Sequence, residues 1–187
     1  MSRDYVNQYL SETEKIIQSI DRNEIMGAID LLSDLKRTQG RLFILGIGGS
    51  AGNASHAVND FRKICNIEAY APTDNVSELT AWTNDDSFDM IFKNWLLTSK
   101  LSDKDALLVF SVGGGSQKAS YNLVLAMEEA KQVGARIVSI VSRDGGAAIK
   151  LSDVCVLVPV IAQERVTPHA EGWQGVLWHL IVGGIRG

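Results

Sequence analysis

The sequence has 187 residues, of which 45% are hydrophobic and 21% charged, a composition typical of a soluble globular protein that folds without disulfides or structural metals. Its net charge of −4, with no basic cluster, argues against nucleic acid as a ligand, because binding to a phosphate backbone needs a positive face. Only two cysteines occur, which is no disulfide framework and suits a reducing cytoplasm. No apolar run approaches the ~20 residues of a membrane span, and the N-terminus lacks the apolar core of a signal peptide. We therefore expect a cytoplasmic protein without a membrane partner.

Residues 1–40 are predicted to form a helical arm. Apolar side chains recur at helical spacing from Tyr5 to Leu35, with a break near residues 21–23. A glycine, Gly40, follows the second helix, as is common at helix ends. The apolar faces are wide for a segment that precedes the first strand. We therefore expect the arm to pack on another subunit or across the domain.

From residue 41 onward, short apolar runs alternate with helical segments. This alternation predicts an α/β domain, in which a doubly wound parallel sheet is covered by helices on both faces. The expected strands are 41–45, 67–70, 106–110, 136–141 and 154–158, and the expected helices are 50–64, 76–83, 86–100, 117–133, 145–151 and 171–182.

Two glycine-rich loops follow expected strands. Residues 46–53 come directly after the first strand, and residues 111–116 come after the third. A strand that runs into a glycine-rich turn and a helix start forms an anion cradle, because free backbone N–H groups and the helix dipole converge there. Ligands bind beyond the carboxyl ends of such strands. The two loops are predicted to enclose one phosphate from two sides, although the second could also be a plain tight turn.

A dinucleotide site is the alternative reading of the first loop. Gly46, Gly48 and Ala51 satisfy the dinucleotide fingerprint, which tolerates alanine at its third position. That fingerprint also needs an acidic residue at the end of the second strand, whereas Glu68 lies inside the expected strand and Asp74 lies beyond it. A second glycine loop is not part of the scheme, so phosphate is favoured.

Four titratable residues are candidates for metal or proton chemistry. His56 and Asp60 lie one helical turn apart, about 6 Å along the axis, and could share a metal ion or simply form a polar helix face. His179 has apolar neighbours, as core histidines often do. Glu171 lies eight residues earlier, about 12 Å away in an unbroken helix. This span is strained for two ligands of one ion, so Glu171 either lies in a bend before Gly172 or contacts substrate alone.

Taken together, these features resemble the sugar isomerase (SIS) domain family, and within it the phosphoheptose isomerases. The likeness covers nearly the whole chain and rests on the order of its motifs. These are the GxGGS loop, the His-x-x-x-Asp turn, Asn84-Asp85, the second Ser/Gly loop and an acidic residue eight positions before His179. The resemblance implies a flavodoxin-like five-stranded parallel sheet. It also implies an SIS phosphosugar-binding domain over 41–187, an oligomerisation role for 1–40, and a homotetramer with active sites at subunit interfaces.

The resemblance further implies an enzyme, an intramolecular oxidoreductase. This aldose–ketose isomerase would convert sedoheptulose 7-phosphate to a heptose 7-phosphate through a cis-enediol, for heptose or surface carbohydrate biosynthesis. One zinc ion per subunit would be held by His56, Asp60, Glu171 and His179. Asp60 or Glu171 would act as the base and His179 as its acid/base partner. The implied substrate and phosphate contacts are Gly48, Gly49, Ser50, Asn53, Asn84, Asp85, Ser111, Gly113, Gly114 and Ser116.

The sequence departs from the family pattern at several of these positions. Asp60 stands where the family has glutamate, which is one methylene longer, and Glu171 stands where it has glutamine. Ile47, Val112 and Gly113 replace polar residues of the two loops, so backbone N–H groups must carry more of the phosphate binding. A non-catalytic SIS protein, which binds a phosphosugar or assembles with a replication initiator, is the alternative. Two histidines and two carboxylates in the catalytic positions favour the enzyme.

Overall fold

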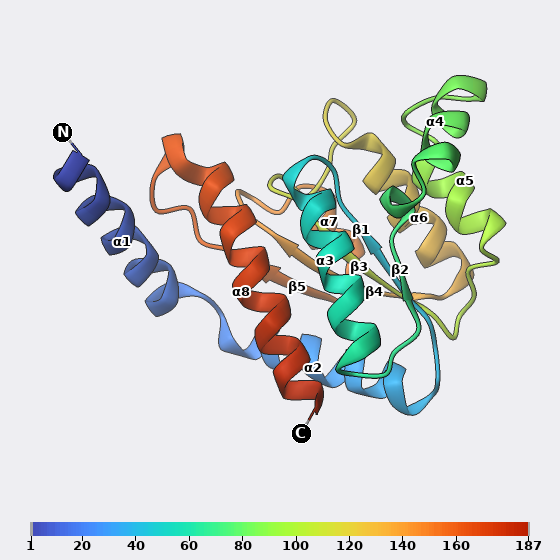
Figure 1. Ribbon diagram of the computed structural model, residues 1–187, viewed down its shortest axis with the longest axis horizontal. Helices are drawn as coiled ribbons and strands as arrows, with labels where there is room; N and C mark the ends of the chain where they lie inside the picture. Colours follow the sequence, from blue (N-terminus) through green and yellow to red (C-terminus); the bar gives the residue numbers. More distant parts are fainter. Residues whose placement is uncertain (1, 187) are drawn as a thin grey trace.

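The structure is a computed structural model that describes residues 2–186, and its centre is a five-stranded sheet (Figure 1). The strand order is β2-β1-β3-β4-β5, and all four strand pairs are parallel. This is the flavodoxin-like order, so the predicted fold class is confirmed. The strands are β1 (Leu42–Leu45), β2 (Ala69–Tyr70), β3 (Ala106–Phe110), β4 (Arg136–Val141) and β5 (Val154–Leu157).

Helices cover both faces of the sheet. They are α1 (Ser2–Ser19), α2 (Arg22–Arg37), α3 (Gly49–Lys63), α4 (Val76–Asp85), α5 (Ile91–Thr98), α6 (Tyr121–Val133), α7 (Ala148–Leu151) and α8 (Val166–Arg186), with short 3-10 turns at Pro72–Asp74 and Gln163–Arg165. Successive side chains of a strand point to opposite faces. Leu42 and Ile44 therefore join the core beneath α2, α3 and α8, whereas Phe43 and Leu45 join the core beneath α5 and α6.

Several helix boundaries differ from the sequence prediction. The last helix begins at Val166, five residues before the expected start. Pro168 is compatible with this earlier start, because it lies in the first turn, where backbone N–H groups have no intrahelical acceptor. The expected helix 117–133 begins only at Tyr121. Ser116 and Ala119 close a turn ahead of it, and Ser120 adopts a left-handed backbone with φ 56°. The expected helices 86–100 and 145–151 are shorter, at Ile91–Thr98 and Ala148–Leu151.

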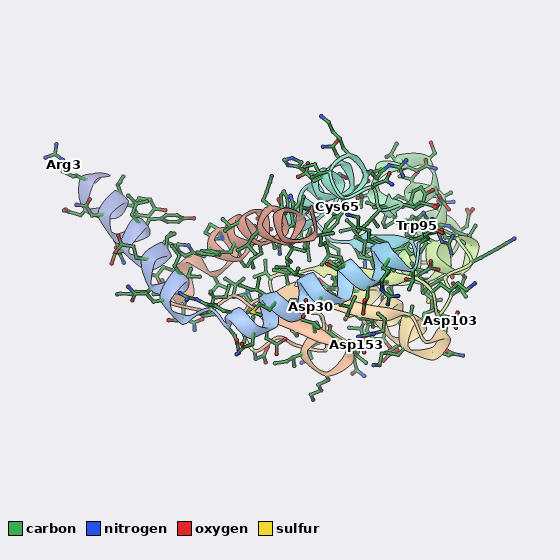
Figure 2. All side chains as sticks on the ribbon, turned by 90° about the horizontal axis from the view of Figure 1, so that it is seen from below. Arg3, Asp30, Cys65, Trp95, Asp103 and Asp153 are labelled. Carbon is green, nitrogen blue, oxygen red and sulfur yellow. The ribbon has the colours of Figure 1, made fainter. Side chains whose placement is uncertain are left out.

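The two N-terminal helices play different structural parts. The α2 helix packs against α8 and β5 and buries Leu32 and Ala28 in the main core, so it packs across the domain as expected. The α1 helix projects from the body of the molecule, with Arg3 near its free end (Figure 2). It leaves Tyr5 and Leu10 exposed.

The two cysteine thiols are free, and neither is chemically activated. Burial raises the pKa of Cys65 above its usual range and raises the pKa of Cys155 to about 11. Both thiols therefore stay protonated near neutral pH and act as small hydrophobic groups.

None of the helices within residues 2–186 combines the length and the hydrophobicity that a membrane span needs.

A buried ionic cluster fastens α1 to the start of α8. The carboxylate of Glu12 accepts hydrogen bonds from Arg165 Nη2 at 2.6 Å and Nε at 2.8 Å, and His169 Nε2 lies 2.9 Å from the same group. The ring of Tyr9 stacks on His169 at a centroid distance of 4.3 Å. Hydrogen bonds from Arg165 and then His169 hold the pKa of Glu12 at about 2. The projecting helix is thus anchored at its middle.

We expect the anchor to make stability depend on pH. Because the folded pKa of Glu12 lies below its ordinary value of 4.5, its carboxylate stabilises the fold above pH 4.5, and this stabilisation is lost as pH falls toward 2. Glu12→Gln should therefore unfold at a lower urea concentration than wild type at pH 7, with the difference narrowing between pH 4.5 and 2. The exposed neighbour variant Glu14→Gln is the control. A difference that stays constant with pH would contradict the assignment.

Candidate active site

The first glycine loop carries the chain from the end of β1 to the start of α3. Gly48 has φ +62°, a conformation that favours glycine. A Cβ at Gly46 would lie 2.3 Å from the carbonyl oxygen of Ser50, so the loop closes tightly on the first turn of the helix. Ser50 is buried there. Since β1 and β3 are adjacent and parallel, the second glycine loop leaves the sheet at the same edge.

Three residues from α3 and α8 converge about two to three helical turns beyond this loop along α3. His179 Nε2 lies 3.4 Å from Asp60 Oδ2, and His56 Nε2 lies 3.9 Å from the same oxygen. One ligand atom from each residue falls within 4.8 Å of the others. The Asp60 side chain is 9% exposed, whereas those of His56 and His179 are 57% and 55% exposed. A buried carboxylate therefore lies beneath two accessible imidazoles. We call this set the His-Asp-His cluster.

Hydrogen bonds orient the members of the His-Asp-His cluster. Nδ1 of His179 lies 2.7 Å from the carbonyl oxygen of Gly175. A carbonyl can only accept, so Nδ1 carries the proton and the lone pair of Nε2 is left facing Asp60. Asn59 Nδ2 donates to Asp60 Oδ1 at 3.1 Å, and Trp178 Nε1 donates to Asp60 Oδ2 at 3.1 Å.

The donor set of the cluster fits a zinc ion. Two imidazole nitrogens and one carboxylate oxygen are a known set of three protein ligands for catalytic zinc, with a fourth position left open. Tetrahedral zinc with ligands at ~2.0–2.1 Å separates its ligand atoms by roughly 3.3 Å. The observed separations of 3.4 and 3.9 Å are close to that value. The tautomer of His179 also leaves its Nε2 lone pair free for a metal.

Glu171 lies outside the cluster, which departs from the expected set of four ligands. The α8 helix runs without interruption from Val166 to Arg186, so the eight-residue spacing separates Glu171 from His179 along the helix axis. The Glu171 carboxylate instead lies against Gly49, where an added Cβ would be 2.5 Å from Oε2. A negative charge at the first turn of α3 is stabilised by the helix dipole. Of the two alternatives for Glu171, a bend before Gly172 is therefore excluded, because α8 is continuous there.

Asn53 connects the same two helices. Its Nδ2 donates to the backbone oxygen of Glu171 at 3.0 Å and to Gln174 Oε1 at 2.8 Å. Gln174 is fully buried, and among residues 2–186 its Nε2 has no hydrogen-bond partner. Both donors of the Asn53 amide are thus used within the protein. The remaining oxygen of Asn53 and the free donor of Gln174 are the groups left for a ligand.

The second glycine loop is held in shape by its own serines. Ser111 Oγ accepts a hydrogen bond from the backbone N–H of Gly114 at 3.1 Å. Ser116 Oγ accepts from the N–H groups of Lys118 and Ala119 at 3.3 and 3.2 Å. Each hydroxyl keeps its own proton as a donor. A pocket of about 400 Å³ opens beside the loop and is lined in part by Gly113, Gly115, Ser116, Arg143 and Thr167.

Two residues at the site were missed from the sequence. Arg143 follows β4 at the same sheet edge. Its Cδ lies 3.8 Å from the position that a Cβ at Gly113 would occupy. Arg143 also lines two pockets, the one of about 400 Å³ beside the second loop and a neighbouring one of about 600 Å³. The sequence pattern that could have identified Arg143 is a cationic residue directly after a parallel strand, because ligands bind at that end of the sheet. Trp178 was not singled out in the sequence either, although a buried indole N–H usually needs a partner.

Asn84 and Asp85 lie at the end of α4. Asn84 Nδ2 donates to Asp85 Oδ1 at 2.9 Å, and both residues are exposed. Within residues 2–186, the carboxylate of Asp85 is not grouped with the His-Asp-His cluster. The structure therefore supplies no contact that links this pair to the cluster.

Comparison with known proteins finds relatives that span most of the chain. The family model described as SIS domain matches residues 4–142. The chain is 30% identical to the phosphoheptose isomerase of Syntrophotalea carbinolica over 94% of its own length and 89% of that protein. It is 29% identical to the lincomycin biosynthesis protein LmbN of Streptomyces lincolnensis over 94% of its own length, and spans 66% of that protein. The structure of phosphoheptose isomerase GmhA from Neisseria gonorrhoeae superposes with a TM-score of 0.86 at 24% identity, covering 99% of this chain and 98% of that one.

Zinc binding should distinguish the three clustered residues from Glu171. We expect His56→Ala and His179→Ala each to weaken zinc affinity by about 100-fold or more, since even outer partners of a metal site contribute about 10–100-fold. Glu171→Gln should stay within about threefold of wild type. Isothermal titration of zinc into chelator-treated protein measures this. Loss of zinc binding in Glu171→Gln to the extent seen in His179→Ala would contradict the three-residue site.

Proposed function

The chain belongs to the SIS domain family, and we propose that it is an aldose–ketose isomerase of the phosphoheptose isomerase type. The substrate is sedoheptulose 7-phosphate and the product a heptose 7-phosphate for heptose or surface carbohydrate biosynthesis. The observation that carries this proposal is the convergence of His56, Asp60 and His179 where α3, the helix that begins at the first glycine loop, packs on α8. The name of the relative from Syntrophotalea carbinolica supports the same activity.

The reaction transfers a proton between C1 and C2 through a cis-enediol, so it needs a base near the carbons and an acid near the oxygens. We assign the acid/base step at the oxygens to His179 Nε2. It is accessible, and the buried Asp60 carboxylate 3.4 Å away stabilises the imidazolium when that nitrogen takes a proton. Glu171 is one candidate base at the carbons, and its carboxylate lies at the first glycine loop, about two turns of α8 before His179. Asp60 is the alternative base, but its burial and its two hydrogen bonds favour a supporting part.

Zinc bound by His56, Asp60 and His179 would occupy the Nε2 lone pair of His179, so the metal would then supply, in place of the Nε2 proton, the Lewis acid that polarises the substrate carbonyl. The His-Asp-His cluster also favours an enzyme over the alternative function, a non-catalytic SIS protein. A protein that only binds a phosphosugar, or assembles with a replication initiator, needs no buried carboxylate held between two imidazoles, so the enzyme is favoured.

The phosphate is assigned to the second glycine loop. The Glu171 carboxylate lies against the first loop, where it would repel a phosphate, whereas the guanidinium of Arg143 lines the pocket of the second loop. Backbone N–H groups and the hydroxyl protons of Ser111 and Ser116 complete the site. The first loop, with Gly48, Gly49 and Ser50, then borders the reacting end of the sugar. Distal phosphate binding positions C1 and C2 for the transfer.

We further propose a cytoplasmic homotetramer with active sites at subunit interfaces. The exposed apolar side chains of α1, including Tyr5 and Leu10, form a surface that a second subunit would cover. The half-exposed rings of His56 and His179 support the same proposal, because a neighbouring subunit that covered them would close the site. Free cysteines agree with a reducing compartment.

Removal of the acid/base nitrogen should abolish most of the turnover. We expect His179→Gln to lower kcat for sedoheptulose 7-phosphate by at least about 100-fold, because general acid–base catalysis contributes roughly 10²–10⁴-fold. The measurement is a coupled assay on zinc-loaded protein, with the melting temperature compared to show that the variant is folded. Unchanged turnover would contradict the assignment of the catalytic centre.

The two arginines at the ends of β4 offer a matched test of phosphate binding. Arg143→Ala should raise KM by about tenfold or more with a smaller change in kcat, since a charge-assisted hydrogen bond contributes about 1.5–3 kcal/mol. Arg136→Ala removes a similar cation at the start of the strand, where it pairs with Asp153, and should leave KM within about twofold. Equal values of KM for the two variants would show that Arg143 does not contact the phosphate.

A further inference from the structure

Trp178 contacts every member of the His-Asp-His cluster. Its indole N–H donates to Asp60 Oδ2 at 3.1 Å. Its ring stacks on His179, with centroids 4.8 Å apart and planes at 30°, and meets the His56 ring edge-on at 5.2 Å. We propose that Trp178 is a positioning residue that holds the Asp60 carboxylate in the orientation in which Oδ2 faces both imidazoles. The inference rests on the proposed function, because it concerns the same site.

The short side chain of Asp60 explains why such a partner matters. Oδ2 is the oxygen that both imidazoles approach, at 3.4 Å from His179 and 3.9 Å from His56. A partial rotation of the carboxylate would turn the oxygen that faces the two rings out of line with them. With Asn59 donating to Oδ1 and Trp178 to Oδ2, rotation would misalign both hydrogen bonds. The carboxylate is therefore fixed before any ligand binds.

Indole is well suited to this role. It donates one proton and accepts none, so it adds no charge beside the cluster and cannot compete for a metal ion. Trp178 is 3% exposed, and its ring also packs on Phe110 at a centroid distance of 5.9 Å. A side chain with two torsions, held by packing on several sides, keeps its N–H in one place. Hydrogen bonds to a carboxylate are also stronger than those between neutral groups.

The alternative is that Trp178 only fills the core and uses Asp60 as a convenient acceptor. Trp173 provides the comparison, because it lies on the same helix, is similarly buried and belongs to the same core. Within the described part of the chain, its indole is not hydrogen-bonded to the cluster. If burial were the whole role of Trp178, replacing either tryptophan by phenylalanine would affect the site equally little.

The test compares Trp178→Phe with Trp173→Phe, since phenylalanine keeps an aromatic ring and removes the N–H. Zinc is titrated into chelator-treated protein by calorimetry, and kcat and KM are measured for sedoheptulose 7-phosphate. Trp178→Phe should bind zinc about 10–100-fold more weakly, the range found for outer partners of metal sites, and should lose kcat by about tenfold or more with KM within twofold. Trp173→Phe should stay within twofold of wild type in all three quantities.

A spectroscopic measurement on protein that keeps Trp178 completes the test. The chain has four tryptophans, so the spectrum of nitrogen-labelled, metal-free protein contains four indole N–H resonances. That of Trp178 is assigned by its loss in Trp178→Phe. Asp60→Ala should shift the Trp178 resonance well beyond the other three, because it removes the acceptor. An unmoved Trp178 resonance would overturn the proposal. If Trp178→Phe fails to fold, the resonance is assigned instead by elimination, with Trp82→Phe, Trp95→Phe and Trp173→Phe.

The outcomes separate this inference from the proposed function. Equal zinc affinity and equal kcat in the two phenylalanine variants overturn the positioning role while leaving the isomerase in place. A wild-type protein that binds zinc but does not isomerise the sugar overturns the proposed substrate, and weaker zinc binding in Trp178→Phe then still supports the role of Trp178. A wild-type protein that neither binds zinc nor isomerises the substrate overturns both.

Discussion

The packing of α3 against α8 on one face of the sheet is the constraint on which the site depends. The two helices are more than 100 residues apart in sequence, yet they share one core and are joined by hydrogen bonds from Asn53 to Gln174 and from Trp178 to Asp60. Each helix contributes only part of the His-Asp-His cluster. The contact between them therefore creates the chemistry, and any change that separates the two helices would dismantle it.

Charge divides the sheet edge into two functional halves. A carboxylate from α8 lies over the first turn of α3, at Gly49, and it occupies the place where a generic anion cradle would receive a phosphate. The second loop instead has a cation, Arg143, at its rim. The edge therefore has a carboxylate at the first loop, and both a cation and the Asp144 carboxylate at the second, where Asp144 Oδ1 accepts from the Gly146 N–H. The guanidinium at the second loop is the group that suits the anionic end of a ligand.

The N-terminal helices divide into an integral and a projecting part. The α2 helix completes the core beneath one sheet face, so it cannot be removed without exposing apolar surface. The α1 helix is held through the buried Glu12 carboxylate and its partners Arg165 and His169, which lie at the start of the helix that carries His179. The same two residues, Arg165 and His169, therefore link the position of α1 to the position of α8.

The sequence by itself determined the five strands, their parallel arrangement and both glycine loops, because buried strands and glycine turns leave local patterns in composition and spacing. It also identified His56, Asp60 and His179 as candidates. Only the tertiary structure decided which of them meet. An unbroken α8 carries Glu171 away from the cluster, since helix continuity through Gly172 depends on packing against the rest of the domain rather than on local propensity. The tertiary structure likewise revealed the contacts of Trp178 and Arg143, because a hydrogen bond or pocket between distant segments leaves no pattern in the sequence of either segment alone.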